Sequence, residues 1–126
     1  MTEYSAPCPD RDFDEADQLL RRFSPDFYDS ETRELDPGVF KNYPFPELRR
    51  CSVNWSECST IDEALGPQPR YGIASIPVGF CRGEDQEIER APEDDNDSHC
   101  NLIGEKPMSR RRRFAKAADV VRVPQG

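Results

Sequence analysis

Residues 98–124 read SHCNLIGEKPMSRRRRFAKAADVVRVP, and this stretch decides the fold that the sequence predicts. The apolar pair Leu102 and Ile103 favours a strand, and Ser109 is a suitable cap for a helix that follows it. Three valines between positions 120 and 123 then favour a closing strand. The stretch therefore predicts a strand, a helix and a strand, against which the upstream chain packs.

Upstream, apolar residues from Phe13 to Phe23 recur at helical spacing, with Asp12 as a cap and Pro25 as a stop. They predict an N-terminal helix over residues 13–23. Alternating or apolar runs predict strands at 48–55, 71–80 and 86–91, and Thr60 with Glu63 forms the capping-box pattern of a short helix. We expect an α+β fold, a small and mainly antiparallel sheet with an N-terminal helix and a C-terminal helix packed on it.

The length of 126 residues is that of one domain. We expect a flexible N-terminal arm over residues 1–12, which are polar, and a single α+β domain over residues 13–126. The formal net charge of −8 argues against a general nucleic-acid coat and against an anionic membrane surface as partner. No apolar run approaches the ~18 residues that a membrane span needs, so no membrane partner is expected.

The five cysteines form an odd count without a CxxC pair, and the residues after Met1 are polar rather than those of a secretory leader. Both observations favour a reducing compartment. We therefore expect a cytoplasmic protein with free thiols, most of them small apolar core side chains.

His99 is the only histidine, and the acidic residues 93–97 precede it. A nearby carboxylate would orient its ring, so His99 is a candidate catalytic acid or base; the alternative is a structural histidine at a strand end. Counting from Asp94, the same segment partly matches a calcium loop, but His99 occupies the position where such a loop needs glycine. A zinc site would lack paired ligand spacing. No metal and no cofactor are predicted.

Four consecutive basic residues open the predicted C-terminal helix: Arg110, Arg111, Arg112 and Arg113. They are candidates for binding a phosphate, an acidic partner protein or nucleic acid. The alternative is a solvated helix face whose arginines pair with the chain's own Asp and Glu side chains.

Alternation along the strand 48–55 places Arg50, Ser52 and Asn54 on one face. An arginine beside a hydroxyl and an amide suits the anionic group of a ligand, and equally describes the solvated face of an antiparallel sheet. Trp55, at the end of the strand, joins these three as a candidate binding residue, although the alternation points it inward.

Several segments between Leu19 and Val121 carry a resemblance: Leu20-Arg-Arg-Phe-Ser-Pro25, Phe40, Cys51-Ser-Val-Asn-Trp55, Gly72-Ile-Ala, Ser98-His-Cys-Asn-Leu-Ile-Gly104 and the Ala-rich C-terminal helix. The chain resembles a group of short uncharacterised bacterial proteins with Leu-x-Arg-Arg-x-x-Pro, Ser-Val-Asn and His-x-x-x-Ile-Gly segments. The resemblance implies a prokaryotic origin and one small domain, and it implies no activity.

We expect, first, a small cytoplasmic bacterial or phage accessory protein that binds a larger protein partner; a defence or toxin–antitoxin setting would suit it. The alternative is a small enzyme for a nucleotide or phosphate-bearing substrate, with His99 as acid or base and Arg50 and Arg112 on the phosphate. A second alternative is nucleic-acid binding through residues 110–113. If His99, Arg50 and Asn54 line one concave pocket, the enzyme is favoured.

Overall fold

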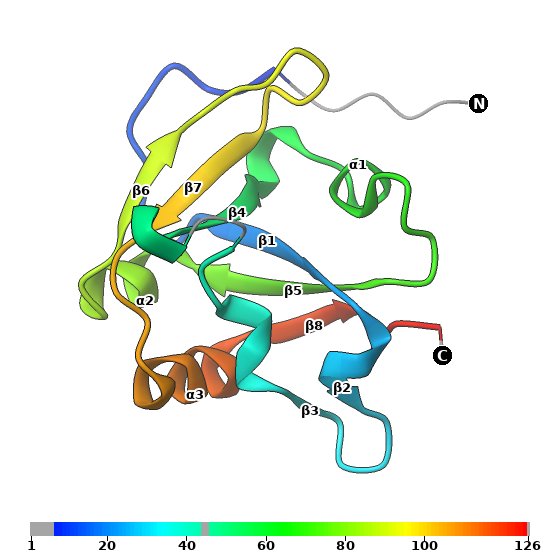
Figure 1. Ribbon diagram of the computed structural model, residues 1–126. Coiled ribbons are helices and arrows are strands. Elements are labelled where there is room, and N and C mark those ends of the chain that lie inside the picture. Colours follow the sequence, from blue (N-terminus) through cyan, green and yellow to red (C-terminus); the bar gives the residue numbers. More distant parts are fainter. Residues whose placement is uncertain (1–6, 44–45, 126) are drawn as a thin grey trace.

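Six antiparallel strands form the main sheet of the computed structural model, which describes residues 7–43 and 46–125 (Figure 1). Their order is β6-β7-β4-β1-β5-β8, and β2 and β3 form a separate hairpin. The strands are β1 Gln18–Phe23, β2 Tyr28–Asp29, β3 Glu34–Leu35, β4 Arg50–Trp55, β5 Gly72–Pro77, β6 Glu87–Arg90, β7 His99–Ile103 and β8 Asp119–Arg122. The α-helices are α1 Ile61–Leu65, α2 Val78–Gly83 and α3 Met108–Ala117, and the 3-10 helices are η1 Pro25–Phe27, η2 Pro37–Phe40, η3 Pro46–Leu48 and η4 Ser56–Cys58.

The predicted α+β class and antiparallel sheet are confirmed. The strands expected at 48–55 and 86–91, the closing strand and the C-terminal helix correspond to β4, β6, β8 and α3. The capping box is also present: Glu63 N–H donates to Thr60 Oγ1 at 3.1 Å, and Thr60 N–H donates to Glu63 Oε1 at 3.3 Å. These features depend on contacts within a few residues, which a sequence pattern can report.

The N-terminal helix predicted over residues 13–23 is wrong, because this segment ends in the strand β1 and the first α-helix begins at Ile61. β1 lies inside the sheet, between β4 and β5, and therefore buries side chains on both faces. Leu19 and Phe23 belong to the main core, whereas Leu20 packs against α1 on the other face. Apolar residues on both faces of one strand produced the spacing that resembles a helix.

Two boundaries also differ from the prediction. The strand expected over 71–80 ends at Pro77, which has an extended backbone and precedes α2. Pro77 is therefore at a strand end, where its missing N–H costs no ladder hydrogen bond, and β5 is not an edge strand. At α3, Pro107 rather than Ser109 is the capping position, and no side chain caps this helix.

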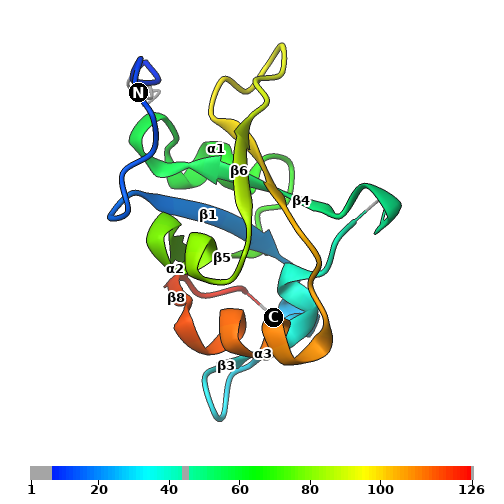
Figure 2. The same cartoon turned by 90° about the vertical axis from the view of Figure 1, so that its left-hand side faces the viewer.

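The main core lies on the sheet face that α2, α3 and η2 cover. Figure 2 shows α2 beside β5, and α3 next to β8. Phe114 of α3 is fully buried, with its ring 5.3 Å from both Phe40 and Phe80 between centroids. The opposite face carries a smaller cluster, in which α1 contributes Ala64 and Leu65. This second face is only partly covered, so it is the face on which polar side chains of β4 and β7 remain accessible.

The structure corrects the expectation of five free thiols, because a disulfide joins Cys8 to Cys58 across 50 residues of sequence. Cys51, Cys81 and Cys100 are free and buried, as expected for core side chains. Burial raises the pKa of the Cys81 thiol to about 12 and that of Cys100 to about 11, so both stay protonated near neutral pH.

The disulfide attaches part of the predicted flexible arm, residues 1–12, to the rest of the fold. Residues 1–6 of that arm lie outside the described residues, whereas residues 7–12 include the cysteine that is bound to η4. In the part of the chain that the structure describes, no helix has the length and apolar character needed to cross a membrane.

Loss of this disulfide is expected to destabilise the fold. Closing a loop of 50 residues restricts the unfolded chain, and a loop of that size corresponds to about 4 kcal/mol in the chain-entropy account, with ~2–5 kcal/mol typical for native disulfides. We expect the Cys8→Ser variant to lose a free energy of unfolding in that range in a urea titration.

Dithiothreitol provides the control for this prediction. It should lower the unfolding midpoint of the wild type to that of Cys8→Ser and should leave the variant unchanged. An equal midpoint for the oxidised wild type and Cys8→Ser would contradict the prediction.

Candidate functional site

A pocket opens where β1 separates from β4. The two strands pair at only two positions, Leu19 with Trp55 and Leu20 with Asn54, whereas β1 stays paired with β5 over all six of its residues. Beyond Leu20, β4 continues to pair with β7 and β1 with β5, so the sheet splits along this line. The split, together with α1 and the segment 38–43, encloses a pocket of about 800 Å³.

The side chain of Arg21 bridges the split. Its Nε donates to the carbonyl of Val39 at 2.8 Å, and its Nη1 donates to the carbonyl of Ser52, also at 2.8 Å. The guanidinium thus satisfies a β4 carbonyl that the missing β1–β4 ladder leaves available, and it fixes η2 to the same place. A positive charge is in this way built into the pocket wall.

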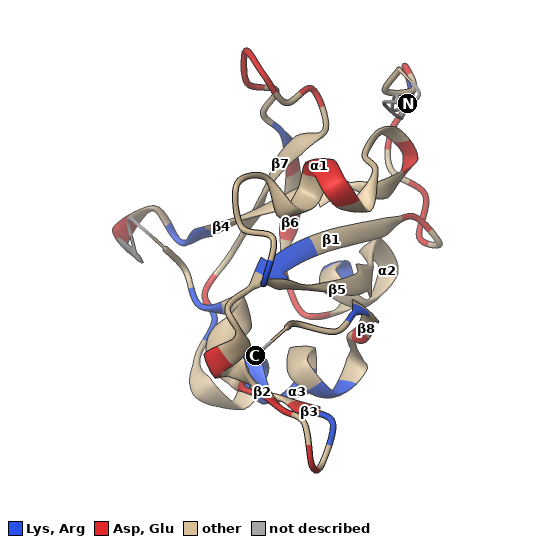
Figure 3. Cartoon of the chain, turned by 90° about the vertical axis from the view of Figure 1, so that its right-hand side faces the viewer, with Lys and Arg blue, Asp and Glu red and all other residues tan. Residues whose placement is uncertain are grey.

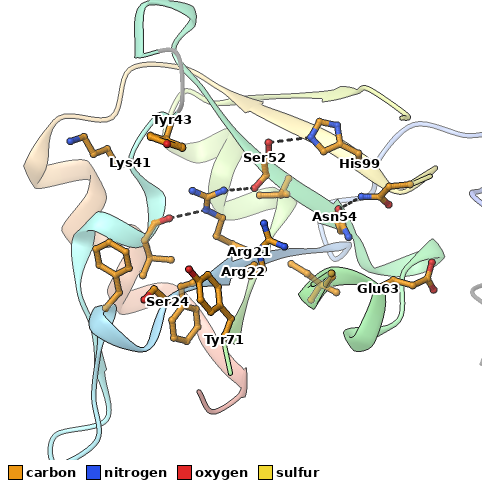
Figure 4. A pocket seen from close by; sticks show the side chains of 18 of the residues that line it. Arg21, Arg22, Ser24, Lys41, Tyr43, Ser52, Asn54, Glu63, Tyr71 and His99 are labelled. Carbon is orange, nitrogen blue, oxygen red and sulfur yellow. Dashed lines mark hydrogen bonds between the residues drawn. The ribbon is translucent and has the colours of Figure 1, made fainter. Parts of the chain in front are cut away.

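Three of the candidate residues from the sequence line this pocket: Ser52, Asn54 and His99 (Figure 4). The charged side chains that line it are Arg21, Arg22, Lys41, Glu63, Glu93 and Asp95. Figure 3 shows the basic segment of β1 in the open face, with the acidic α1 next to it. The pocket therefore holds cations and carboxylates in different parts of its wall.

His99 is held by two hydrogen bonds. Its Nδ1 lies 2.7 Å from the carbonyl oxygen of Ala91, and its Nε2 lies 3.1 Å from the hydroxyl of Ser52. The group that orients the ring is a backbone carbonyl and not the carboxylate that the sequence suggested. The ring is only partly buried, and Figure 4 shows its contact with Ser52 facing the pocket.

Asn54 organises the loop between β6 and β7. Its Oδ1 accepts from Asn96 Nδ2 at 3.0 Å, its Nδ2 donates to Ser59 Oγ at 3.3 Å, and Asn96 in turn accepts from Ser98 Oγ at 2.7 Å. Because both ends of the Asn54 amide have partners, this residue holds the pocket wall rather than offering a free group to a ligand.

Two further cations border the pocket. Arg22 Nη1 donates to the carbonyl of Leu65 at 2.9 Å, and its guanidinium lies 5.9 Å from the ring centre of Tyr71. Lys41 is exposed, and its ammonium group has no hydrogen-bond or ion-pair partner among the described residues. Lys41 is therefore the cation that a ligand can bind without displacing an existing contact.

Arg50 and Trp55 do not line the pocket. Arg50 lies at the start of β4, opposite Ile103 of β7. Trp55 is fully buried, and its ring lies between the guanidiniums of Arg11 and Arg90, at 5.3 and 5.2 Å from the ring centre. The candidate role of Trp55 in binding is thus not supported by its position, since the ring packs inside the protein.

The four arginines of α3 have different environments. Arg110 contacts Glu84 and Asp85, both at 3.3 Å, and Arg113 contacts Glu84 at 2.8 Å. Arg113, followed by Arg110, lowers the pKa of the Glu84 carboxyl despite partial burial. These two arginines therefore pair with carboxylates of the same chain, as in the second of the two interpretations of the arginine run.

The other two arginines have no carboxylate partner within residues 7–43 and 46–125. Arg111 Nε donates to the carbonyl of Lys106 at 3.0 Å, and Arg112, which is exposed, has no side-chain partner among the described residues. Arg112 lines a second hollow of about 1080 Å³ between α3, β8 and the β2–β3 hairpin. Its basic members are Arg33, Arg112, Arg113 and Lys116, and its apolar members include Leu35, Ala115, Ala118, Val120 and Val123.

Within the described ranges, no group of three or more His, Cys, Asp or Glu side chains is placed to hold a metal ion. No known protein family matches the chain, and neither a curated protein nor a solved structure matches it. The resemblance to short bacterial proteins stays a prediction, and the function has to be argued from the site itself.

The sequence missed the cations of the pocket. Arg21 and Arg22 fall within the helix predicted over residues 13–23, and Lys41 lies outside every predicted helix and strand. In a central strand, two adjacent arginines beside Leu19, Leu20 and Phe23 would have been conspicuous. No local signal indicates that β1 and β4 separate, because the contact between Arg21 and Ser52 joins residues that are 31 positions apart in the sequence.

Arg21 is expected to stabilise the fold as well as the pocket. The Arg21→Met variant keeps the aliphatic part of the side chain and leaves the carbonyls of Val39 and Ser52 without their donor. We expect a loss of about 2–3 kcal/mol in the free energy of unfolding, since hydrogen bonds to charged groups contribute ~1.5–3 kcal/mol each and water can replace part of them.

Lys41→Met is the matched control, because it removes a cation from the same pocket but breaks no described contact. Its change should stay within about 0.5 kcal/mol. Urea titrations of both variants test this, and equal losses would show that Arg21 is not the residue that holds the split.

Proposed function

We propose that the pocket over the split between β1 and β4 binds a small anionic molecule, a nucleotide or another phosphate-bearing metabolite, and that His99 is the acid or base of the site. The observation that carries this proposal is the convergence of Ser52, Asn54 and His99 with three cations around one concavity. Arg50, which was expected to hold the phosphate, does not line the pocket; Arg21, Arg22 and Lys41 take that place in the proposal.

The residues that line the pocket suit a ligand that has an anionic group, an aromatic ring and further polar groups. The ammonium group of Lys41 has no partner among the described residues and can reach a phosphate as a flexible point charge. Tyr43, which is 68% exposed, and Tyr71 also line the pocket and can contact a ring. The carboxylates of Glu93 and Asp95 can accept hydrogen bonds from amino or hydroxyl groups at the opposite end.

Calorimetric titration with AMP, ADP and inorganic phosphate tests the proposal. We expect at least one of them to bind the wild type, and Lys41→Ala to weaken binding about tenfold or more, because a hydrogen bond to a charged group contributes ~1.5–3 kcal/mol. Lys116→Ala, which changes a lysine of the second hollow, should leave the affinity unchanged. Absence of binding at millimolar concentration, or an equal effect of the two lysines, would refute the proposal.

The second candidate function is the binding of a larger protein partner, as an accessory protein, at the hollow between α3, β8 and the β2–β3 hairpin. Charge favours an acidic segment of that partner. Four basic residues, Arg33, Arg112, Arg113 and Lys116, line the hollow against two acidic ones, Glu34 and Asp119, on a chain of net charge −8, and apolar side chains complete the lining. Arg110 and Arg113 are engaged with Glu84, which weakens the case for nucleic-acid binding through the whole run 110–113.

An affinity purification from the native host tests the second candidate with the double variant Arg112→Glu/Lys116→Glu. We expect a protein recovered in stoichiometric amount with the wild type to be lost with this variant. It should be retained with Arg70→Glu, an exposed charge reversal outside the hollow. Retention by the double variant would contradict the proposed surface, and recovery of nucleic acid instead would favour the third hypothesis.

Both proposals include a cytoplasmic location. Because the cytoplasm keeps thiols reduced, this location implies that Cys8 and Cys58 are reduced in the cell. Thiol alkylation at the moment of lysis, followed by mass spectrometry of the peptides that contain the two cysteines, distinguishes the two states.

A further inference from the structure

A continuous chain of hydrogen bonds runs from the carbonyl of Ala91 through the ring of His99 to the hydroxyl of Ser52. The first contact is 2.7 Å to Nδ1 and the second is 3.1 Å to Nε2. A carbonyl oxygen only accepts hydrogen bonds, so in the neutral ring the proton belongs to Nδ1. Nε2 then has a free lone pair, and Ser52 is the donor in the second contact. An unprotonated nitrogen is thus aimed at a serine hydroxyl.

The pairing of β4 with β7 produces this geometry. Asn54 lies opposite His99 and Ser52 opposite Asn101, so Ser52 and His99 are diagonal neighbours on one face. An imidazole is long enough to span that diagonal. Ala91 is bonded to His99 twice, because its N–H also donates to the His99 carbonyl at 3.0 Å. The ring is therefore fixed from behind by the end of β6, and Ser52 itself is exposed to the pocket.

We infer that Ser52 is a nucleophile and His99 its general base, in acyl transfer from a carboxylic ester that carries an anionic group. A nucleophile, a base within hydrogen-bond reach and a third group that orients the base are the elements of an activated serine. Here the third group is a neutral carbonyl. It fixes the tautomer but offers less stabilisation to the imidazolium than a carboxylate would, so a slow reaction is expected.

The step balances with water as the second substrate. Ser52 Oγ attacks the ester carbon, its proton passes to His99 Nε2, and the bond from carbon to the alcohol oxygen breaks as that proton passes to the leaving alcohol. Water, deprotonated by the same Nε2, then attacks the acyl carbon. The bond from that carbon to Ser52 Oγ breaks as the proton passes from Nε2 to Oγ, which releases the carboxylic acid and restores the serine and the neutral ring. Arg21 also lines this pocket, and its guanidinium, held beside Ser52 by the hydrogen bond from Nη1 to the Ser52 carbonyl, is the group proposed to stabilise negative charge that develops on the ester oxygen.

The inference rests on the proposed function in one respect, since the same pocket must admit the substrate and its anionic group. Arg22 and Lys41 line that pocket, together with Ser52 and His99. A phosphate or carboxylate on the ester would be attracted to these cations, whereas a neutral ester would gain no such attraction. The substrate class is accordingly an ester with at least one negative charge.

A fluorophosphonate probe tests the nucleophile, because its phosphorus forms a stable bond with an activated serine and releases fluoride. We expect one adduct on the wild-type chain, located on the peptide that contains Ser52 by mass spectrometry. Ser52→Ala should abolish it, and His99→Gln should slow it about a hundredfold, the lower range for general-base catalysis. Ser109→Ala, which changes an exposed serine of α3, is the matched control and should label like the wild type.

A second variant guards against misfolding of His99→Gln. In Ser52→Cys, the new thiol should react with iodoacetamide about tenfold faster than in Ser52→Cys/His99→Gln, because the imidazole promotes the thiolate. No adduct on the wild type, an adduct that survives Ser52→Ala, or equal thiol rates would overturn the inference. Binding of AMP without labelling would refute the nucleophile alone, whereas labelling without binding of any phosphate ligand would refute the proposed function alone.

Discussion

The two hydrogen bonds of the Arg21 guanidinium are the constraint on which the site depends. β1 and β4 pair at only two positions, and a sheet split in this way exposes backbone carbonyls that need donors. Arg21 donates one hydrogen bond to a carbonyl of β4 and one to a carbonyl of η2. Its side chain thus forms part of the pocket wall at the place where the β1–β4 ladder is interrupted. The same side chain thereby contributes to the fold and to the charge of the pocket.

The arginines of α3 differ in whether a carboxylate of the chain neutralises them. Glu84 takes up Arg110 and Arg113, and this pairing fastens the helix to the end of α2. Surface ion pairs of this kind contribute little free energy, but they decide which charges remain available to a partner. Arg112, Arg113 and Lys116 of α3 line the second hollow, but Arg113 is paired with Glu84. Of the four consecutive arginines, only Arg112 therefore lines the hollow without a carboxylate partner among the described residues.

Features that depend on neighbouring residues were predicted correctly, and features that depend on long-range contacts were not. The capping box at Thr60 and the alternation along β4 are decided by neighbouring residues, and both were predicted. The segment 13–23 was not, because a central strand buries both faces and its apolar spacing then matches a helix as well as a strand. The bond between Cys8 and Cys58 and the meeting of Arg21 with Ser52 join residues far apart in sequence, and no spacing pattern encodes them. For the site, Ser52, Asn54 and His99 could be singled out, whereas the cations around them could not.

The position of Trp55 has a spectroscopic consequence. It is the only tryptophan, it is fully buried, and its indole lies between Arg11 and Arg90. Arg11 in turn grips Asp17 with two hydrogen bonds, close in sequence to the disulfide-bound Cys8. The fluorescence of this single indole therefore reports on whether the N-terminal segment is packed against the ring. The emission maximum lies at short wavelength while Arg11 covers the ring, and it shifts to longer wavelength when the segment detaches and water reaches the indole.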